Sequence, residues 1–168
     1  MTRIIPPVPP EGNRGTTSIT DEQWIRIRHH AEAIFTLGPH SIHGPDHWRR
    51  VENFGLELAR ESGADKTVVR LFAILHDSCR RNDGGDFHHG PRAADMLSSL
   101  VPDLFTLGSD RLSLLEHAIR NHTKGRTSVD PTIGTCWDSD RLDLGRVGMR
   151  PHERYMSTKA GRRRVRKL

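Results

Sequence analysis

The sequence predicts a compact all-α fold in a single domain, and three observations support this expectation. Apolar residues recur at helical spacing in several successive segments, whereas no segment shows the strict alternation of a half-buried strand. No repeat of fixed period is present, so neither a solenoid nor a propeller is expected. At 168 residues the chain is long enough to bury one hydrophobic core and too short for two.

Composition divides the chain into three regions. Residues 1–17 are rich in Pro, Gly and Thr without an apolar period, which predicts a disordered N-terminal arm. Residues 18–150 carry the helical periodicity and form the expected domain. Residues 151–168 form a basic C-terminal tail, which we expect to be solvated and disordered, because six of the last ten residues are Lys or Arg. The formal net charge of +5 belongs mainly to this tail.

The first two helices have clear boundary signals. The capping pair Thr20 and Gln23 begins a helix that stops before Gly38. The second helix has Pro45 in its first turn and apolar residues at helical spacing, and it ends at Gly63.

The later helices are predicted from their apolar patterns. Residues 65–77 are apolar on nearly every side, as expected for a central buried helix. A polar loop separates them from apolar residues between 93 and 100, and a further helix is expected over 109–121. We interpret the residues from His122 to Thr135 as a loop. The helical pattern over 137–147 is the weakest, because three aspartates interrupt it.

Several functional classes are excluded by the sequence. No apolar run approaches the roughly 18 residues needed to span a bilayer, and the first residues lack the apolar core of a signal peptide, so we expect a cytoplasmic protein. Cys79 and Cys136 are too few for a disulfide framework, and we expect reduced thiols. No dinucleotide-binding glycine motif, P-loop or nucleophilic serine motif is present.

Histidine and aspartate residues at two helices indicate a site. The expected buried helix ends in His76 and Asp77, and a charged Asp is almost never buried unless it is paired or binds a metal. His47 lies on the same stripe as Val51 and Leu58 and should point inward. Taken alone, the doublet also fits a solvated helix end, and His47 also fits a hydrogen-bonded core residue.

The strings DHWRRV, LFAILHDSCR and DSDRLDLG, in this order, resemble the HD-domain superfamily of metal-dependent phosphohydrolases. Its ligand order is a His, a His-Asp doublet and a distant Asp that precedes a basic and an apolar residue. The resemblance covers roughly residues 45–148 and implies a helical bundle of the HD type. It implies the metal ligands His47, His76, Asp77 and Asp140, of which Asp77 and Asp140 would also be catalytic.

Two further histidines resemble the added ligands of two-metal HD enzymes, in particular the family that hydrolyses symmetrical dinucleoside tetraphosphates. They are His89 in HHGPRAA and His122 in IRNHTKGR, and the resemblance implies that Asp77 would bridge two ions. Only eleven residues separate Asp77 from His89, a short loop that departs from that family. His88 competes with His89 for this role. His89 also fits a polar residue at the N-terminus of a helix, and His122 fits one at a C-terminus, where the helix dipole favours it.

Each of four other polar residues near these positions has two possible roles. His43 and Asp46 flank the first ligand and could orient it by hydrogen bonding, and surface roles remain equally open. Asp138 and Asp143 are expected either to support a ligand or to lie at the surface.

Four basic residues on the expected loops are candidates for contact with phosphate oxygens. They are Arg80, Arg81, Lys124 and Arg126, although charges on loops are more often simply solvated.

The sequence therefore predicts hydrolysis of a phosphate ester or anhydride by metal-bound water, with a nucleotide or related small phosphorylated molecule as substrate. The cofactor would be one or two divalent ions among Mn, Fe, Co, Ni and Zn. The alternative is a metal-binding regulatory module without turnover. We expect no membrane partner and no dedicated nucleic-acid binding by the terminal residues 159–168, which lack interleaved aromatic residues. The oligomeric state is not predicted.

Overall fold

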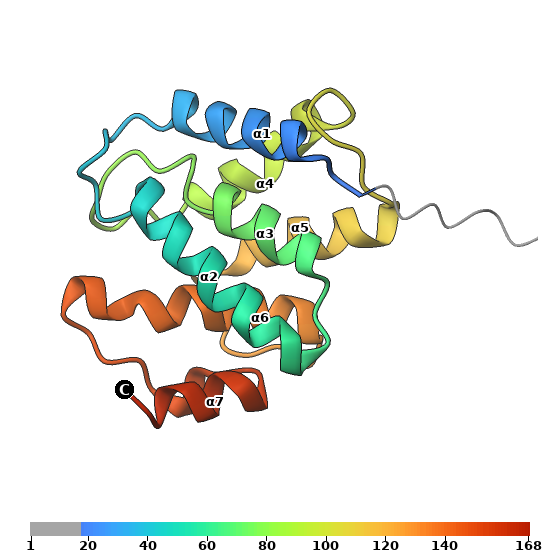
Figure 1. The fold of residues 1–168 in the computed structure, drawn as a ribbon. Helices are drawn as coiled ribbons and strands as arrows, with labels where there is room; N and C mark the ends of the chain where they lie inside the picture. The colour runs from blue at the N-terminus through green and yellow to red at the C-terminus, as the bar shows by residue number, and fades with distance from the viewer. Residues whose placement is uncertain (1–17) are drawn as a thin grey trace, which may run out of the picture.

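The computed structural model describes residues 18–168, and this part of the chain is helical without a strand (Figure 1). The all-α prediction is confirmed. The predicted arm, residues 1–17, lies outside the described residues. The elements are α1 (Asp21–Ile34), α2 (Pro45–Ser62), α3 (Lys66–Leu75), α4 (His89–Leu100), α5 (Ser109–Asn121), α6 (Pro131–Leu142), η1 (Asp143–Val147), η2 (Glu153–Tyr155) and α7 (Lys159–Val165).

The helix boundaries follow local hydrogen-bonding signals. Thr20 and Gln23 form the predicted capping box of α1. Gly63 ends α2 in the left-handed region at φ 74°, a conformation that glycine adopts without strain. Asp65 caps α3 by accepting the backbone N–H groups of Thr67 and Val68.

The prediction of a loop from His122 to Thr135 is wrong for residues 131–135, which are helical. Helix α6 begins at Pro131, because the carboxylate of Asp130 accepts two backbone N–H groups of the first turn and proline fits that position. The helix also ends earlier than the predicted range of 137–147, and residues 143–147 form the 3-10 helix η1.

Helix α3 is the centre of the bundle. It packs against α1, α2, α5 and α6, and α4 packs on α5 (Figure 1). Its apolar side chains are fully or almost fully buried, as predicted from a pattern without a polar face. The core therefore surrounds α3 and fixes the position of the residues that follow it.

The basic tail is not disordered over residues 159–165. These residues form α7, which packs against α2 and α6 (Figure 1). A second apolar cluster lies beneath it and consists of Leu58, Leu142, Met156, Ala160 and Val165. The prediction of a solvated tail is wrong here because Ala160, Gly161 and Val165 of this helix are buried against the body.

Asp138 attaches this C-terminal segment to the domain. Its buried carboxylate accepts the backbone N–H of Ser157 at 2.6 Å and the backbone N–H and hydroxyl of Thr158, each at 2.8 Å. Gly161 lies so close that an added Cβ would stand 2.4 Å from Asp138 Oδ2. The sequence suggested that Asp138 is a surface charge or supports a ligand. In the structure it has neither role and instead anchors α7.

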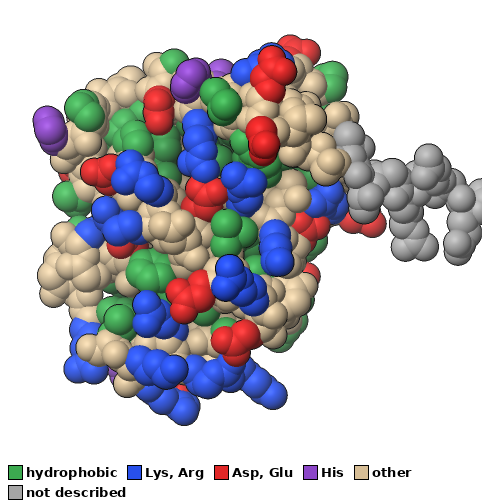
Figure 2. Space-filling model, in the orientation of Figure 1, with side chains coloured by type: hydrophobic (Ala, Val, Ile, Leu, Met, Phe, Trp, Pro, Cys, Tyr) green, Lys and Arg blue, Asp and Glu red, His purple; other side chains and the backbone are tan. Residues whose placement is uncertain are grey.

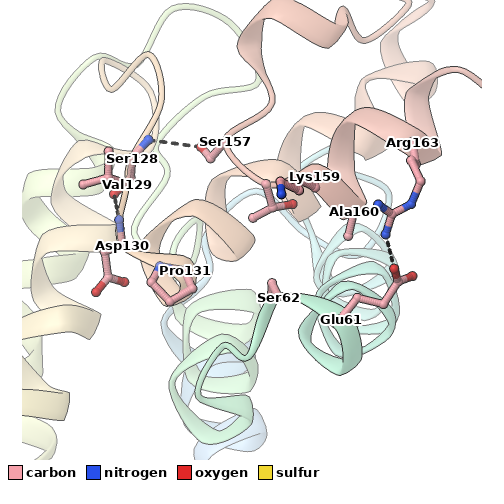
Figure 3. A pocket seen from close by; sticks show the side chains of 11 residues that line it. Glu61, Ser62, Ser128, Val129, Asp130, Pro131, Ser157, Lys159, Ala160 and Arg163 are labelled. Carbon is pink, nitrogen blue, oxygen red and sulfur yellow. Dashed lines mark hydrogen bonds and ion pairs between the residues drawn. The ribbon is translucent and has the colours of Figure 1, made fainter.

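The segment also contacts the loop before α6 and the end of α2. Ser128 N donates to Ser157 Oγ at 3.1 Å, and Arg163 is paired with Glu61 (Figure 3). Lys and Arg side chains gather over the lower part of the molecule, where α7 lies (Figure 2). Within the described residues, no helix is both long enough and apolar enough to cross a membrane.

Candidate metal centre

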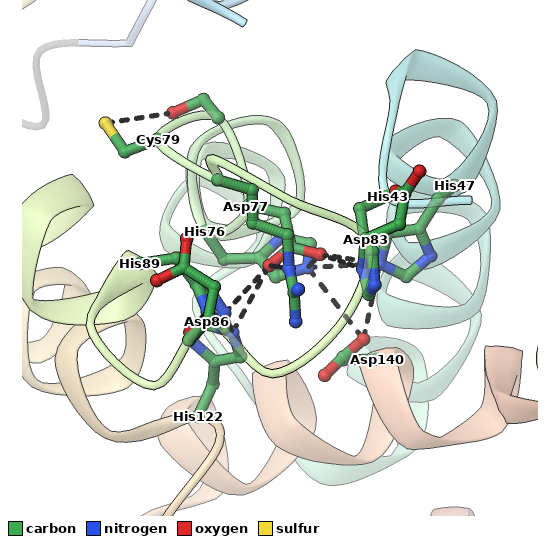
Figure 4. A network of polar contacts seen from close by, with 12 residues as sticks. His43, His47, His76, Asp77, Cys79, Asp83, Asp86, His89, His122 and Asp140 are labelled. Carbon is green, nitrogen blue, oxygen red and sulfur yellow. Dashed lines mark hydrogen bonds and ion pairs between the residues drawn. The ribbon is translucent and has the colours of Figure 1, made fainter. Parts of the chain in front are cut away.

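Six residues that the sequence singled out as ligands meet at one place in the bundle (Figure 4). They come from five helices or their ends: His47 from α2, His76 and Asp77 from the end of α3, His89 from α4, His122 from the end of α5 and Asp140 from α6. Five of them are buried, and the side chain of Asp140 is 21% exposed. The centre is therefore open to solvent mainly at Asp140.

Four of these residues form one cluster. His47 Nε2 lies 3.2 Å from His76 Nε2, 3.3 Å from Asp140 Oδ1 and 3.6 Å from Asp77 Oδ2. His76 Nε2 lies 3.7 Å from Asp77 Oδ2 and 3.8 Å from Asp140 Oδ1. Two ligand atoms about 2.1 Å from one ion are separated by about 3.0 to 3.4 Å. The cluster is thus close to the size that a coordinated ion requires.

A second cluster shares Asp77 with the first. His89 Nε2 and His122 Nε2 are 2.7 Å apart and lie 3.0 Å and 3.5 Å from Asp77 Oδ1. The other oxygen, Oδ2, faces His47 and His76. The two carboxylate oxygens therefore point to different pairs of imidazoles. His88, the competing candidate, is exposed.

Backbone carbonyls orient three of the rings. His76 Nδ1 lies 3.1 Å from a carbonyl oxygen one turn earlier in α3, and His122 Nδ1 lies 2.7 Å from the carbonyl oxygen of Ile119. His89 Nδ1 contacts the carbonyl oxygen of Asp86. When Nδ1 donates to a carbonyl, the lone pair of Nε2 is left for a metal. All three rings present Nε2 to the centre.

A carboxylate orients the fourth ring. His47 Nδ1 lies 2.7 Å from Asp143 Oδ2, and Arg50 donates to both oxygens of Asp143 at 2.7 and 3.0 Å. Of the two roles that the sequence left open for Asp143, the structure therefore supports the ligand-orienting one. This chain of contacts fixes the ring of His47 and increases its basicity as a ligand.

His43 and Asp46 differ in their positions. His43 Nδ1 lies 2.8 Å from Asp77 Oδ2, so it holds the shared carboxylate and not His47. Asp46 is exposed and paired with Arg49 at 2.9 Å. Arg80, for which the sequence suggested a phosphate contact, donates from Nε to Asp77 Oδ1 at 3.2 Å. A basic residue one turn after the doublet is the signal that could have identified it.

The short loop between Asp77 and His89 is organised by Asp86. Its carboxylate accepts the backbone N–H of Arg81 at 2.9 Å and pairs with Arg92. Desolvation raises the pKa of Asp86, but the hydrogen bond and charge of Arg92 outweigh it and lower this pKa to about 2. The ionised carboxylate thus closes the loop and places His89 at the start of α4.

Charges within the centre balance one another. Burial lowers the pKa of His76 to about 3, so this ring is neutral at physiological pH. Burial opposes the charge of His47 and His122 too, but neighbouring carboxylates outweigh it and raise the pKa of both rings. Burial also opposes ionisation of Asp77 and Asp140, yet the surrounding histidines hold their pKa values well below the usual range. Once His47 and His122 have lost their protons, the centre offers neutral nitrogen and anionic oxygen donors, which suit divalent metals.

The side chains of Arg81, Lys124 and Arg126 are exposed on the loops where the sequence placed them. Cys79 packs against Met96, with 3.8 Å between the sulfur atoms. Cys136 is buried in the core, and burial raises the pKa of its thiol.

Comparisons with known proteins support a general reaction class. No protein-family model matches the chain, and no solved structure matches it. A curated protein of Staphylococcus aureus (strain NCTC 8325 / PS 47), named "Bis(5'-nucleosyl)-tetraphosphatase, symmetrical", is 28% identical over 119 residues. The match covers 61% of this chain and 59% of the relative, so it spans less than two thirds of the relative's length. This likeness and the buried His and Asp cluster fit a metal-dependent phosphohydrolase.

The contact between Asp143 and His47 predicts a loss of metal affinity in Asp143→Asn. The amide keeps the shape of the side chain but is a weaker acceptor for the Nδ1–H group, so we expect about 10- to 100-fold weaker binding of Mn²⁺. Isothermal titration of the metal-free protein measures this change. Asp46→Asn is the matched control, because its side chain is exposed and pairs with Arg49. Equal affinities of the two variants would contradict the role of Asp143.

Proposed function

We propose that this protein is a metal-dependent phosphohydrolase of the HD-domain type. Its substrate class would be a nucleotide or a related small molecule with a phosphate ester or anhydride bond. The observation that carries the proposal is the shared carboxylate of Asp77, whose two oxygens face two separate pairs of buried histidines. The likeness to a tetraphosphatase supports the same reaction class.

Two ions are the proposed cofactor. His47, His76, Asp77 and Asp140 would hold one of them, and Asp77, His89 and His122 the other. The fit rests on the imidazoles of His89 and His122, whose Nε2 atoms approach to 2.7 Å while both Nδ1 atoms contact carbonyl oxygens. Two Nε2 lone pairs directed at each other repel unless a proton or a metal ion lies between or beside them. Mn, Fe, Co, Ni and Zn are all compatible with this mixture of donors.

The residues of the chain would act by holding the two ions and the substrate in position. The chemistry that divalent ions supply at such a site is the activation of water and the neutralisation of charge on phosphoryl oxygens. Asp77 would fix the spacing of the two positions, and His43 and Arg80 would hold its carboxylate in place. Asp140 is the most exposed ligand, so substrate would approach from its side. Arg81, Lys124 and Arg126 remain candidates for contacts with outer phosphates.

The name of the relative describes a symmetrical tetraphosphatase of bis(5'-nucleosyl) compounds. For this chain we propose the broader class of nucleotide-like phosphoanhydrides, because only eleven residues connect Asp77 to His89 and the substrate-facing loops are correspondingly short. The alternative function is a metal-binding module without turnover. A screen of dinucleoside polyphosphates, nucleotides and simple phosphoesters with each metal separates the two functions.

Replacement of Asp77 tests the proposed function most directly. We expect Asp77→Ala to reduce hydrolysis to background and to remove most bound metal, because both clusters lose a ligand, while the circular dichroism spectrum stays helical. Activity and metal content are measured on the same samples. Asp95→Ala, which removes an exposed carboxylate on α4, should retain both. Full hydrolysis by Asp77→Ala would overturn the mechanism.

Replacement of His122 tests the second ion. We expect His122→Ala to lower the metal stoichiometry from two ions to one per chain and to reduce turnover at least about 10-fold, because one cluster loses a nitrogen ligand. Elemental analysis and saturating titration give the stoichiometry. His117→Ala is the control, since His117 lies on the same helix but is exposed and stacks on Trp137. Unchanged stoichiometry and turnover would make His122 a structural residue.

The raised pKa values of His47 and His122 predict how metal binding depends on pH. Protons and metal compete for the same Nε2 atoms, and both pKa values lie above the ordinary 6.5. Affinity should therefore fall as the pH decreases, and the fall should begin above pH 6.5. Excess metal should restore part of the lost activity by mass action. An activity profile at limiting metal that is flat from about pH 5 to 8 would exclude histidine ligation.

A further inference from the structure

The C-terminal segment displays its basic residues on an ordered scaffold. Residues 150–168 contain eight Lys or Arg and one acidic residue. The buried face of α7 and the anchor at Asp138 hold this segment against the body. A rigid display of charge loses less conformational entropy on binding than a disordered tail does. The basic segment is therefore a surface of defined shape.

Only part of this positive charge is neutralised within the molecule. Arg163 pairs with Glu61, and Arg166 pairs through two nitrogens with Glu153. Arg150, Arg154, Lys159 and Lys167 are exposed, and the contacts described for this part of the chain pair none of them with a carboxylate. An excess of positive charge therefore faces solvent at this end of the domain.

Two adjoining hollows lie within this surface. One, of about 780 Å³, lies between the loop that contains Ser128 and the segment from His152 to Ser157. The other, of about 400 Å³, is lined by Arg150, His152 and Arg166 among others. Both hollows are lined in part by His152 and Glu153, so they adjoin each other, and we refer to the two together as the groove. None of the six proposed metal ligands lines it.

An aromatic ring stands beside this groove. Tyr155 is 41% exposed, and the guanidinium of Arg154 lies 4.6 Å from the centre of its ring. The ring of His152 lies 6.2 Å from that of Tyr155. Residues 159–168 contain no aromatic residue, but Tyr155 directly follows Arg154 in the chain and belongs to η2, which packs against α7.

We propose that this groove, lined by Arg150, His152, Arg154, Arg162 and Arg166 and flanked by Tyr155, binds single-stranded nucleic acid without sequence preference. Proteins that do so combine a basic groove for the phosphates with exposed aromatic rings on which bases stack. An anionic membrane fits less well, because the apolar face of α7 is buried against the domain and is not available for insertion. The proposal is independent of hydrolysis at the metal centre.

Fluorescence anisotropy with a labelled oligo(dT) of about twelve nucleotides tests the proposal on the full chain. We expect binding that weakens as salt rises from about 50 to 200 mM. Arg150→Glu with Arg154→Glu should weaken binding at least about 10-fold and make the salt dependence shallower. Arg26→Glu with Lys66→Glu changes the net charge equally on exposed residues elsewhere and should retain binding. If both double variants lose the same affinity for the oligonucleotide, binding depends on the net charge of the protein and not on the groove, and the proposal is overturned.

The aromatic contribution is tested at one position. Tyr155→Leu should weaken binding about 10-fold, whereas Tyr155→Phe, which keeps the ring, should bind within about twofold of the unchanged protein. Tyr155 is partly exposed, and unfolding curves verify that both variants fold. Vesicles with phosphatidylserine and inorganic polyphosphate are the competing ligands. Binding to either with no binding to the oligonucleotide, or equal binding by the Leu and Phe variants, would overturn the assignment to nucleic acid. Hydrolysis is measured in parallel and should not change in any of these variants.

Discussion

The buried carboxylate of Asp77 is the constraint around which the domain is organised. Its side chain is 3% exposed, and an ionised group at such a position is costly unless it is paired or coordinated. Five nitrogen-bearing side chains approach it from α2, α4, α5 and the segments beside α2 and α3: His43, His47, Arg80, His89 and His122. These helices are therefore positioned in part by the need to surround one charge.

Support for this charge extends outward through further contacts. Asp143 fixes His47, and Arg50 fixes Asp143, so the first cluster is held by residues that lie almost a hundred positions apart in the chain. Asp86 performs the corresponding task for His89 by closing the short loop. Ligand orientation by such neighbours changes metal affinity strongly in other proteins. The geometry of the centre is thus a property of several elements together.

The C-terminal end depends on a separate polar contact. Asp138 lies two residues before the candidate ligand Asp140, but its carboxylate faces the opposite direction and holds Ser157 and Thr158. One helix, α6, therefore carries both a candidate metal ligand and the anchor of the basic segment. The proposed nucleic-acid groove and the proposed catalytic site have no lining residue in common.

The sequence by itself determined the helical fold and the candidate ligands. Helical spacing of apolar residues and capping signals at Thr20 and Gly63 act over a few residues, so they can be read without the tertiary structure. The candidate ligands were found because His and Asp at helix ends follow the order of a known family. Asp130 and Pro131 at the start of α6 are also a local capping signal, although apolar periodicity alone does not contain it.

Only the tertiary structure decided how the polar residues are used. Three aspartates close together in one segment have similar surroundings in the sequence, yet Asp138 anchors α7, Asp140 faces the imidazoles and Asp143 holds His47. A rotation of about 100° per residue along a helix directs neighbouring side chains to different partners, and those partners are distant in the chain. The fate of the basic tail was decided in the same way. Burial of Ala160 and Val165 requires the surface that α2 and α6 form together, and no local pattern contains that surface.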